Sequence, residues 1–222
     1  MAEHRTMNME LIQQTEAFLK DTFTASIWLT ANPVEREYRL EHSYRVANLA
    51  KMIAEQEHFN VTYVVMAGLL HDIAYCEEMH TAEDRMNHGR RSAAIARPFL
   101  ERLQLPEDAI QEICYGIAIH VDDQADFQWK RTPFSETVGD ADNLDRFDVY
   151  RIYETLQYNQ FSELPLQEKQ TLLGSTLEKL KRLRGMPLGT TTAKQLWQKR
   201  LDYYIGFYEK LQQQMDNSCA IR

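Results

Sequence analysis

The chain has 222 residues, of which 44% are hydrophobic and 26% are charged, and it contains only 8 Gly and 6 Pro. These proportions are typical of a globular protein rather than a disordered one, and the scarcity of helix breakers favours long helices. The formal net charge of −8 disfavours a nonspecific grip on DNA or RNA, which depends on clustered Lys and Arg. We therefore expect a small ligand and no nucleic acid polymer; bound cations would still allow that ligand to be an anion.

Targeting segments and disulfides are not indicated. No apolar run reaches the roughly 18 residues of a membrane span, and the start MAEHRTMNMELIQQ lacks the apolar stretch of a signal peptide. We therefore expect a cytoplasmic protein that binds no membrane. The cysteines Cys76, Cys114 and Cys219 are scattered and show no CxxC spacing, which favours reduced thiols over a disulfide framework or a zinc knuckle.

Apolar residues recur at spacings of three and four almost throughout, and no sustained period-two segment bounded by hairpin signals occurs. The predicted fold class is therefore all-α. In chain order, we expect helices at about 8–30, 35–57, 61–74, 87–104, 106–120, 134–159, 165–184 and 192–214. Since neither a Gly/Ser linker nor a composition break divides the chain, we expect one domain over residues 1–222.

Four of the seven histidines lie near an end of a predicted helix, on its apolar stripe. His42 lies on the stripe of the second helix, and His71, followed at once by Asp72, ends that of the third. His88 begins the stripe of the fourth helix, and His120 ends that of the fifth. All four should therefore face the core.

Aspartates crowd the stretch VGDADNLDRFDVY, at the start of a predicted helix: Asp140, Asp142, Asp145 and Asp148. Asp142 shares a face with Arg146 and the apolar residues that follow, so it can point inward where Asp148 should not. Acids are also favourable at a helix N-terminus, so capping and solvation remain an alternative for this stretch.

Each histidine alone has an ordinary explanation, because a core imidazole is usually satisfied by a carbonyl or a tyrosine. Burying four imidazoles and two carboxylates without partners, however, would cost about 1 to 3 kcal/mol each, a sum that rivals the ~5 to 15 kcal/mol of a whole domain. A shared cation would satisfy them together. These ligand types suit Mn, Fe, Co, Ni or Zn, and the lack of an inward cysteine pair argues against structural zinc.

The order of His42, then His71 and Asp72, then Asp142 resembles the H…HD…D signature of the HD-domain metal-dependent phosphohydrolases. The segments EHSYRVANLAKMIA, AGLLHDIA and DADNLD are similar to the three conserved blocks of that family, and the C-terminal helices are similar to those of its small bacterial stand-alone members. The resemblance covers roughly residues 35–215. It implies a single HD-domain helical bundle, with a metal-site core at about 35–160 and a C-terminal helical extension at about 161–215.

The resemblance also implies a set of metal ligands. One divalent transition metal ion would be held by His42, His71, Asp72 and Asp142. Asp140 is the alternative to Asp142. His88 and His120 lie where binuclear members carry two further histidines, so they imply a second ion bridged by Asp72. A structural role, or contact with substrate phosphate, remains open for both of these histidines.

The activity implied by the resemblance is metal-assisted hydrolysis of a phosphate ester or anhydride in a nucleotide or other small phosphorylated metabolite. The metal would lower the pKa of bound water from about 15.7 toward ~7, and Asp72 would orient that water. Arg45 and Arg146, one turn from His42 and Asp142, are candidates to stabilise charge on the phosphate. Either arginine could instead point outward or pair with local acids.

Further candidates are less specific. Arg90, Arg91 and the basic segment 178–185 are candidates for phosphate contact, and Glu77 and Glu78 are candidates for the general acid. The last residues are rich in aromatic side chains that favour core or homodimer packing over a nucleobase platform: Trp197, Tyr203, Tyr204, Phe207 and Tyr208.

Departures from the family pattern keep other functions open. The chain lacks a GYP motif, and Tyr75 stands where some deoxynucleotidase members carry a glutamate. A mixed-valent di-iron oxygenase of the HD type, using all four histidines with Asp72 and Asp142, is one alternative. A noncatalytic nucleotide-binding sensor is the other.

Overall fold

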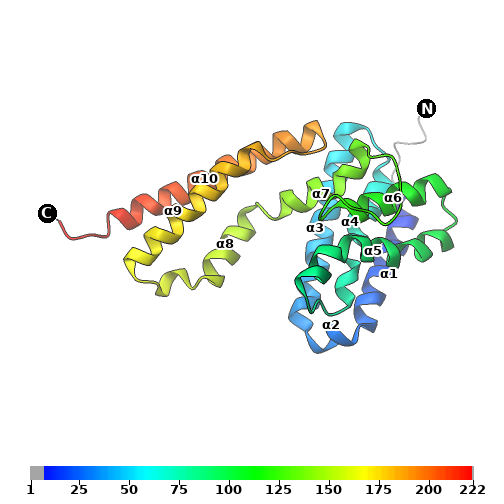
Figure 1. Ribbon diagram of the computed structural model, residues 1–222, viewed down its shortest axis with the longest axis horizontal. Helices are drawn as coiled ribbons and strands as arrows, with labels where there is room; N and C mark the ends of the chain where they lie inside the picture. The colour runs from blue at the N-terminus through cyan, green and yellow to red at the C-terminus, as the bar shows by residue number, and fades with distance from the viewer. Residues whose placement is uncertain (1–7, 222) are drawn as a thin grey trace. The chain divides into compact units, whose positions relative to one another are not determined.

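The computed structural model of the protein describes residues 8–221, which form α-helices and short 3-10 helices and contain no strand (Figure 1). The α-helices are α1 (Met9–Ala25), α2 (Ile27–Ala31), α3 (Pro33–Glu57), α4 (Val61–Leu70), α5 (Ala82–Arg102), α6 (Glu107–Ile119), α7 (Pro133–Asp145), α8 (Val149–Tyr158), α9 (Leu166–Arg182) and α10 (Thr191–Asp216). The 3-10 helices are η2 (Ile73–Cys76), η3 (Phe161–Glu163) and η4 (Leu183–Gly185). The predicted all-α fold class is confirmed.

None of the helices formed by residues 8–221 combines the length and the apolar character that a membrane span requires. The most apolar helix, α4, has 10 residues, about half of what a span needs. The first seven residues, which belong to the segment used to argue against a signal peptide, lie outside the described residues.

The contacts between residues divide the chain into two compact units. The first consists of Met1–Asn143 with Gly189–Ala193, and the second of Leu144–Leu188 with Lys194–Arg222. Compactness alone does not establish whether the units fold independently. The expectation of one domain, with its C-terminal extension beginning near residue 161, therefore stays a prediction.

Helices of the first unit approach each other closely at two glycines. A Cβ atom added at Gly68 of α4 would lie 2.9 Å from Ala47 Cα in α3, and one at Gly89 of α5 would lie 2.7 Å from Ala118 O in α6. Glycine is therefore needed at both crossings, since larger residues would separate the backbones. Each crossing lies within three residues of a histidine that the sequence predicts as a ligand, so close packing brings these histidines into reach of one another.

Two predicted boundaries in the first half of the chain are wrong because capping side chains override the apolar period. The helix expected at about 8–30 is interrupted at Ser26, whose hydroxyl accepts a hydrogen bond from Leu29 N at 3.0 Å and so begins α2. Helix α5 begins at Ala82 rather than near residue 87, because Thr81 and Asp84 form a reciprocal capping box.

The helix expected at about 134–159 is in fact two helices, α7 and α8. Asp148 accepts a hydrogen bond from Val149 N at 2.7 Å and caps α8. Asp140 and Asp142 therefore lie in the second half of α7 rather than at the start of a helix, and Arg146 lies in the turn after it. The apolar period continues across the break, which is why the pattern predicts one helix.

In the second unit, α9 and α10 run antiparallel as a hairpin (Figure 1). Gln170 donates to Asp216 at 2.8 Å near one end, and Trp197 Nε1 donates to Leu183 O at 2.9 Å near the other. Three of the five C-terminal aromatic residues are buried, namely Trp197, Tyr204 and Tyr208. Their burial supports the core-packing interpretation, whereas Tyr203 and Phe207 are exposed.

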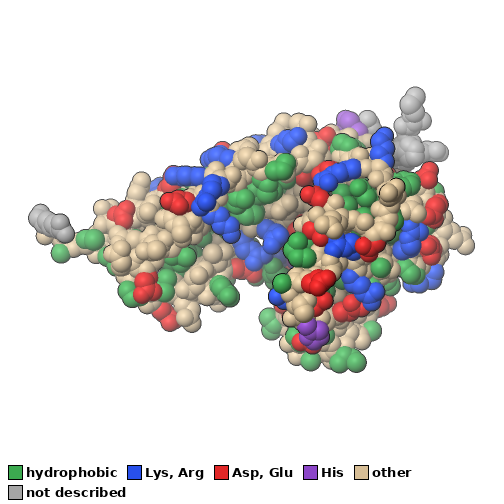
Figure 2. Space-filling model, in the orientation of Figure 1, with side chains coloured by type: hydrophobic (Ala, Val, Ile, Leu, Met, Phe, Trp, Pro, Cys, Tyr) green, Lys and Arg blue, Asp and Glu red, His purple; other side chains and the backbone are tan. Residues whose placement is uncertain are grey.

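The basic segment 178–185 is paired with acids. Lys181 Nζ lies 3.3 Å from Glu209 Oε1, and Arg184 Nη2 lies 2.7 Å from Asp202 Oδ1. Charged side chains of both signs are interspersed over the face drawn in Figure 2, and few histidines appear on it. These pairs favour the interpretation of the segment as a solvated helix end.

Candidate metal centre

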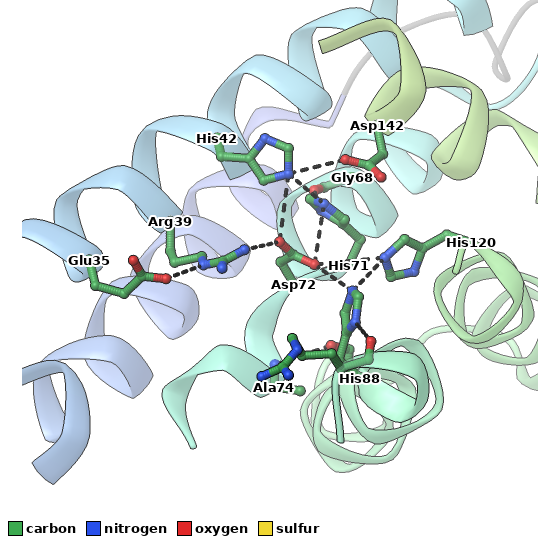
Figure 3. Close-up of polar contacts among 12 residues, drawn as sticks. Glu35, Arg39, His42, Gly68, His71, Asp72, Ala74, His88, His120 and Asp142 are labelled. Atoms are coloured by element: carbon green, nitrogen blue, oxygen red, sulfur yellow. Dashed lines mark hydrogen bonds and ion pairs between the residues drawn. The ribbon is translucent and has the colours of Figure 1, made fainter. Parts of the chain in front are cut away.

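The six residues that the sequence predicts as ligands lie together in the first unit (Figure 3). They are His42 from α3, His71 and Asp72 from the end of α4 and the turn after it, His88 from α5, His120 from the end of α6, and Asp142 from α7. Their side chains are at most 13% exposed, the value for Asp142, and that of His71 is fully buried. Charges in such a cluster need partners, because water is largely excluded.

The first group of candidate ligands is His42, His71 and Asp72, whose ligand atoms all lie within 4.8 Å of one another. His42 Nε2 is 3.3 Å from His71 Nε2 and 3.6 Å from Asp72 Oδ2. Asp142 joins this group with Oδ1 3.2 Å from His42 Nε2. These are the four residues of the H…HD…D order, and their role as ligands stays a prediction.

The second group is Asp72, His88 and His120, again with ligand atoms within 4.8 Å of one another. Asp72 Oδ1 is 3.0 Å from His88 Nε2 and 3.7 Å from His120 Nε2, and the two Nε2 atoms are 3.1 Å apart. Asp72 belongs to both groups. Its carboxylate would therefore be the ligand common to both ions if each group held one.

Backbone carbonyl groups hold three of the four imidazoles from the side away from the cluster. The hydrogen bonds run from Nδ1 of His71 to Gly68 O at 2.8 Å, from Nδ1 of His88 to Arg85 O at 2.5 Å, and from Nδ1 of His120 to Ile117 O at 2.7 Å. Since a carbonyl oxygen only accepts, each Nδ1 carries a hydrogen and each neutral ring presents the Nε2 lone pair to the cluster. Such outer hydrogen bonds orient metal-binding histidines.

The contacts among these inward-facing atoms require positive charge. With Nδ1 protonated, neutral His88 and His120 cannot donate from Nε2, yet their Nε2 atoms face each other at 3.1 Å. The carboxylates of Asp72 and Asp142 add two negative charges. Extra protons could balance them, but a divalent cation satisfies carboxylates and lone pairs together. The residues therefore fit a divalent transition metal ion such as Mn, Fe, Co, Ni or Zn.

The distances between donor atoms agree with this fit. Two ligands about 2.1 Å from one ion lie roughly 3.0 Å apart in octahedral and roughly 3.4 Å apart in tetrahedral coordination. The shortest donor pairs of the cluster are 3.0, 3.1, 3.2 and 3.3 Å. A metal ion would therefore need little movement of the side chains.

Burial and neighbouring charges shift the pKa values of the cluster. Burial lowers the pKa of His71 to about 4. Burial alone would raise the pKa of Asp142, but the hydrogen bond from His42 and the nearby imidazoles lower it to about 2. Burial opposes charge on His120 as well, yet the hydrogen bond to Asp72 and its charge raise the pKa. A neutral His71 and ionised Asp142 are the states in which both bind metals.

Asp140 has a different role from Asp142. Its Oδ1 accepts a hydrogen bond from Gly189 N at 3.0 Å, and its Oδ2 accepts from Thr190 N at 3.0 Å and Thr190 Oγ1 at 2.9 Å. Both oxygens are thus engaged with the segment that precedes α10. This geometry favours Asp142 over Asp140 as the candidate ligand and makes Asp140 an anchor of the first unit.

We expect Asp140→Ala to lower the free energy of unfolding by roughly 2 to 4 kcal/mol, less than the sum of three charge-assisted hydrogen bonds, because contacts that share one carboxylate are not additive. Metal content should stay at the wild-type value. Urea unfolding and elemental analysis measure the two effects, with Asp148→Ala as a control that removes a helix cap worth about 1 kcal/mol and a half-exposed ion pair with Arg200. A metal-free but stable Asp140→Ala protein would reverse the assignment.

The surroundings of Arg45 and Arg146 differ. Arg45 Nη1 is 3.7 Å from Glu41 Oε2, one turn earlier in α3, which is the local pairing left open as the alternative. Arg146 is exposed in the turn after α7 and belongs to the second unit. The expected relation to Asp142 on one continuous helix is therefore wrong. Catalytic roles for both arginines stay predictions.

The remaining candidates contact acids or lie at the surface. Arg90 Nη1 donates to both carboxylate oxygens of Asp122, at 3.0 and 2.8 Å. Arg91 Nε donates to Glu77 Oε2 at 2.9 Å, and this ion pair is exposed. Glu78 is exposed as well. These pairs explain the two arginines structurally, and the general acid stays unassigned.

Arg39 contacts the cluster but was missed by the sequence analysis. Its Nη1 lies 3.2 Å from Asp72 Oδ2, and its Nε lies 2.8 Å from Glu35 Oε1 (Figure 3). The guanidinium group lies over the ring of Tyr75, 3.4 Å from the ring centroid. Helical spacing could have indicated it, because Arg39 precedes His42 by three residues and so shares its face of α3.

An all-α protein that gathers four histidines and two aspartates from separate helices belongs to the class of helical proteins with a buried cluster that could hold a metal ion. The HD domain family matches residues 39–150, a span that contains all six clustered residues and Arg39. The chain therefore belongs to the HD domain family. Membership supports a metal-dependent phosphohydrolase in general terms and leaves the substrate open.

Solved structures share the fold. A predicted HD superfamily hydrolase from an uncultured Thermotogales bacterium is 18% identical, with 90% of each chain covered and a TM-score of 0.60. Bacillus subtilis YpgQ in complex with ADP is 21% identical, with 93% of this chain and 95% of that chain covered and a TM-score of 0.62. An HD-superfamily hydrolase from Bacillus thuringiensis is 23% identical, with 95% and 99% covered and a TM-score of 0.65. No curated protein gives a significant match.

Proposed function

We propose that the protein is a metal-dependent phosphohydrolase that cleaves a phosphate ester or anhydride in a nucleotide or other small phosphorylated metabolite. The observation that carries this proposal is the convergence of four imidazoles on the two carboxylate oxygens of Asp72, within two overlapping groups of ligand atoms. The hydrogen bonds to backbone carbonyls leave the Nε2 lone pairs available for a cation.

The proposed ligands are His42, His71, Asp72 and Asp142 for one ion, and Asp72, His88 and His120 for a second. A divalent ion supplies a nucleophilic water at neutral pH and polarises the phosphoryl oxygen that it contacts. Asp72, whose Oδ2 lies near His42 and whose Oδ1 lies near His88, would orient the attacking water. The buried walls of the cluster limit access of bulk water and strengthen these electrostatic contacts.

A nucleotide is the substrate class that we favour. Bacillus subtilis YpgQ, which shares the fold, has been solved in complex with ADP. The acidic net charge of the chain is no obstacle, because divalent ions bound at the cluster would make the local potential positive. A nucleoside di- or triphosphate offers the anionic oxygens that such ions prefer.

The six-residue ligand set also fits the oxygenase alternative, since two overlapping groups that share Asp72 are what a di-iron site requires. The two functions predict different measurements. A mixed-valent di-iron EPR signal with substrate-dependent oxygen uptake would favour the oxygenase, whereas phosphate release with Mn, Co or Ni would favour the hydrolase.

We expect chelator-treated protein to be inactive and to regain phosphate release when Mn, Co or Ni is restored, because the activated water depends on the ion. The assay is a panel of nucleoside mono-, di- and triphosphates and simple phosphate esters, read by released phosphate. Mg added to the same apoprotein is a useful contrast, since imidazole ligands disfavour it. Retained ligand binding without turnover across the whole panel would replace this proposal with the sensor function.

A further inference from the structure

We propose that Arg39 is a positioning residue that sets the orientation of the Asp72 carboxylate, so that Oδ1 faces His88 and Oδ2 faces His42. This inference rests on the proposed metal centre, and it adds a residue outside the H…HD…D pattern. Arg39 would act through Asp72 and would not itself contact the metal.

The two oxygens of Asp72 have different neighbours. Oδ1 lies 3.0 Å from His88 Nε2 and 3.7 Å from His120 Nε2, and it also lies 3.6 Å from His71 Nε2 of the first group. Oδ2 faces His42 Nε2 at 3.6 Å and Arg39 Nη1 at 3.2 Å. Rotation of the carboxylate would break both sets of contacts. The contact with Arg39 therefore fixes which oxygen faces His42 and which faces His88.

Asp72 has little else to hold it. It lies between α4 and η2, with φ of −105° and ψ of 12°, and its side chain makes no hydrogen bond to the start of η2. Among residues 8–221, its side-chain partners other than Arg39 are imidazole Nε2 atoms, from His42, His71, His88 and His120. Bound metal would take those Nε2 atoms and the carboxylate as ligands, so Arg39 would be the side-chain hydrogen-bond donor left to Asp72 among the described residues.

Arg39 is itself fixed from two sides. Glu35, one turn earlier in α3, accepts a hydrogen bond from Arg39 Nε at 2.8 Å, and Tyr75 lies under the guanidinium plane. The ring of Tyr75 also contacts that of His88, at 4.9 Å between centroids. The Arg39 side chain is only 19% exposed, so these contacts are poorly screened by water. A planar guanidinium group can form hydrogen bonds along two edges while its face stacks on an aromatic ring. The ammonium group of lysine cannot do both.

Orientation and charge act in opposite directions on metal affinity. A guanidinium near the centre repels a divalent ion, so its removal would tighten binding if Arg39 were only a nearby charge. Its removal would weaken binding if Arg39 orients a ligand, because outer-sphere partners of ligands typically account for about 10- to 100-fold in affinity. The sign of the change therefore separates the two roles.

The test measures Co(II) and Mn(II) affinity of the full chain by equilibrium dialysis, together with the visible absorption spectrum of the Co(II) form. We expect Arg39→Ala to bind Co(II) about 10- to 100-fold more weakly and to change its spectrum. Millimolar guanidinium should restore part of the affinity. Arg39→Lys should remain weakened, because lysine keeps the charge but not the planar guanidinium group.

Two further variants complete the design. Glu35→Gln, which keeps an acceptor for Arg39 Nε, should show a smaller loss than Arg39→Ala. Arg36→Ala removes a neighbouring arginine of the same helix and should leave affinity and spectrum unchanged. Unfolding curves of the apoproteins establish that each variant folds.

Unchanged or tighter Co(II) binding by folded Arg39→Ala overturns the positioning role. A wild-type protein that binds no metal would instead overturn the proposed function itself. If the wild type binds metal but hydrolyses no phosphate compound, the loss of affinity in Arg39→Ala still supports the positioning role. The two proposals therefore fail through different observations.

Discussion

Alanine in place of Asp72 should remove metal binding from both groups of candidate ligands and lower phosphate release by about 10³-fold or more. Asp72 is the residue that the two groups share, so its loss leaves the second group with imidazoles alone and the first with two imidazoles and Asp142. Lewis-acid catalysis by a bound ion is worth several kcal/mol, and about 4 kcal/mol corresponds to that factor. No other single substitution in the cluster should have as large an effect.

The measurement combines phosphate release with elemental analysis of the purified variant. His88→Ala is the informative comparison, because it removes a ligand of the second group and leaves His42, His71, Asp72 and Asp142 in place. We expect it to lower the metal content from two ions to one if the centre is binuclear. Asp126→Ala, which removes a carboxylate that is 80% exposed, controls for the loss of negative charge.

Unfolding of the apoprotein must be measured in parallel. Burial alone would raise the pKa of Asp72, but His71, His120 and His88 hold it well below its usual value, so the ionised carboxylate also supports the fold. Asp72→Asn keeps the shape and one acceptor oxygen and should remain folded. Full turnover and metal content in both Asp72 variants would remove the basis of the proposed centre.

Much of the fold follows from patterns that act over short distances along the chain. The three-and-four spacing predicts each long helix, since amphipathic helices bury one stripe. Two of the errors occur where a single polar side chain ends a helix that the stripe would continue. Ser26 and Asp148 both do so by accepting backbone hydrogen bonds at the start of a new helix. A capping hydroxyl or carboxylate is common in a sequence, so only the structure shows which of them caps.

The cluster was predictable to a similar degree. The histidines at inward-facing helix ends and the adjacent Asp72 stand out from the apolar stripe, and the structure brings them together. The distinction between Asp140 and Asp142 was not predictable, because it depends on hydrogen bonds to residues about 50 positions later. The contact of Arg39 with Asp72, 33 residues away, was not predictable either, although the spacing of three from His42 could have indicated Arg39 as a neighbour of the cluster.

The sequence pattern also does not show where two helices approach each other closely. Gly89 follows His88 in α5, and a Cβ atom there would lie 2.7 Å from Ala118 O and 3.1 Å from both Ile117 O and His120 Nδ1. The same Ile117 carbonyl accepts the hydrogen bond that orients His120. A glycine inside a helix usually costs stability, so its presence here indicates a packing requirement.

We therefore expect Gly89→Ala to lower the free energy of unfolding by about 1 to 3 kcal/mol, because the methyl group meets backbone atoms that cannot rotate away. Displacement of α5 from α6 should also separate His88 from His120. Binding of a second ion should then weaken by at least about tenfold, which is the usual effect of losing a group that orients a metal ligand. Thermal unfolding and metal titration measure the two consequences in one preparation.

Gly206→Ala is the matched control. Its added methyl group meets nothing within 4 Å on the exposed side of α10, so it should stabilise the protein by about 0.5 to 1 kcal/mol, the usual gain from alanine inside a helix. The two substitutions are chemically identical. Their effects on the free energy of unfolding should differ in sign only because of what lies beside the new Cβ atom. Equal stabilisation by both would mean that α5 and α6 have room to spare at Gly89, and the close contact would then not be what holds His88 against His120.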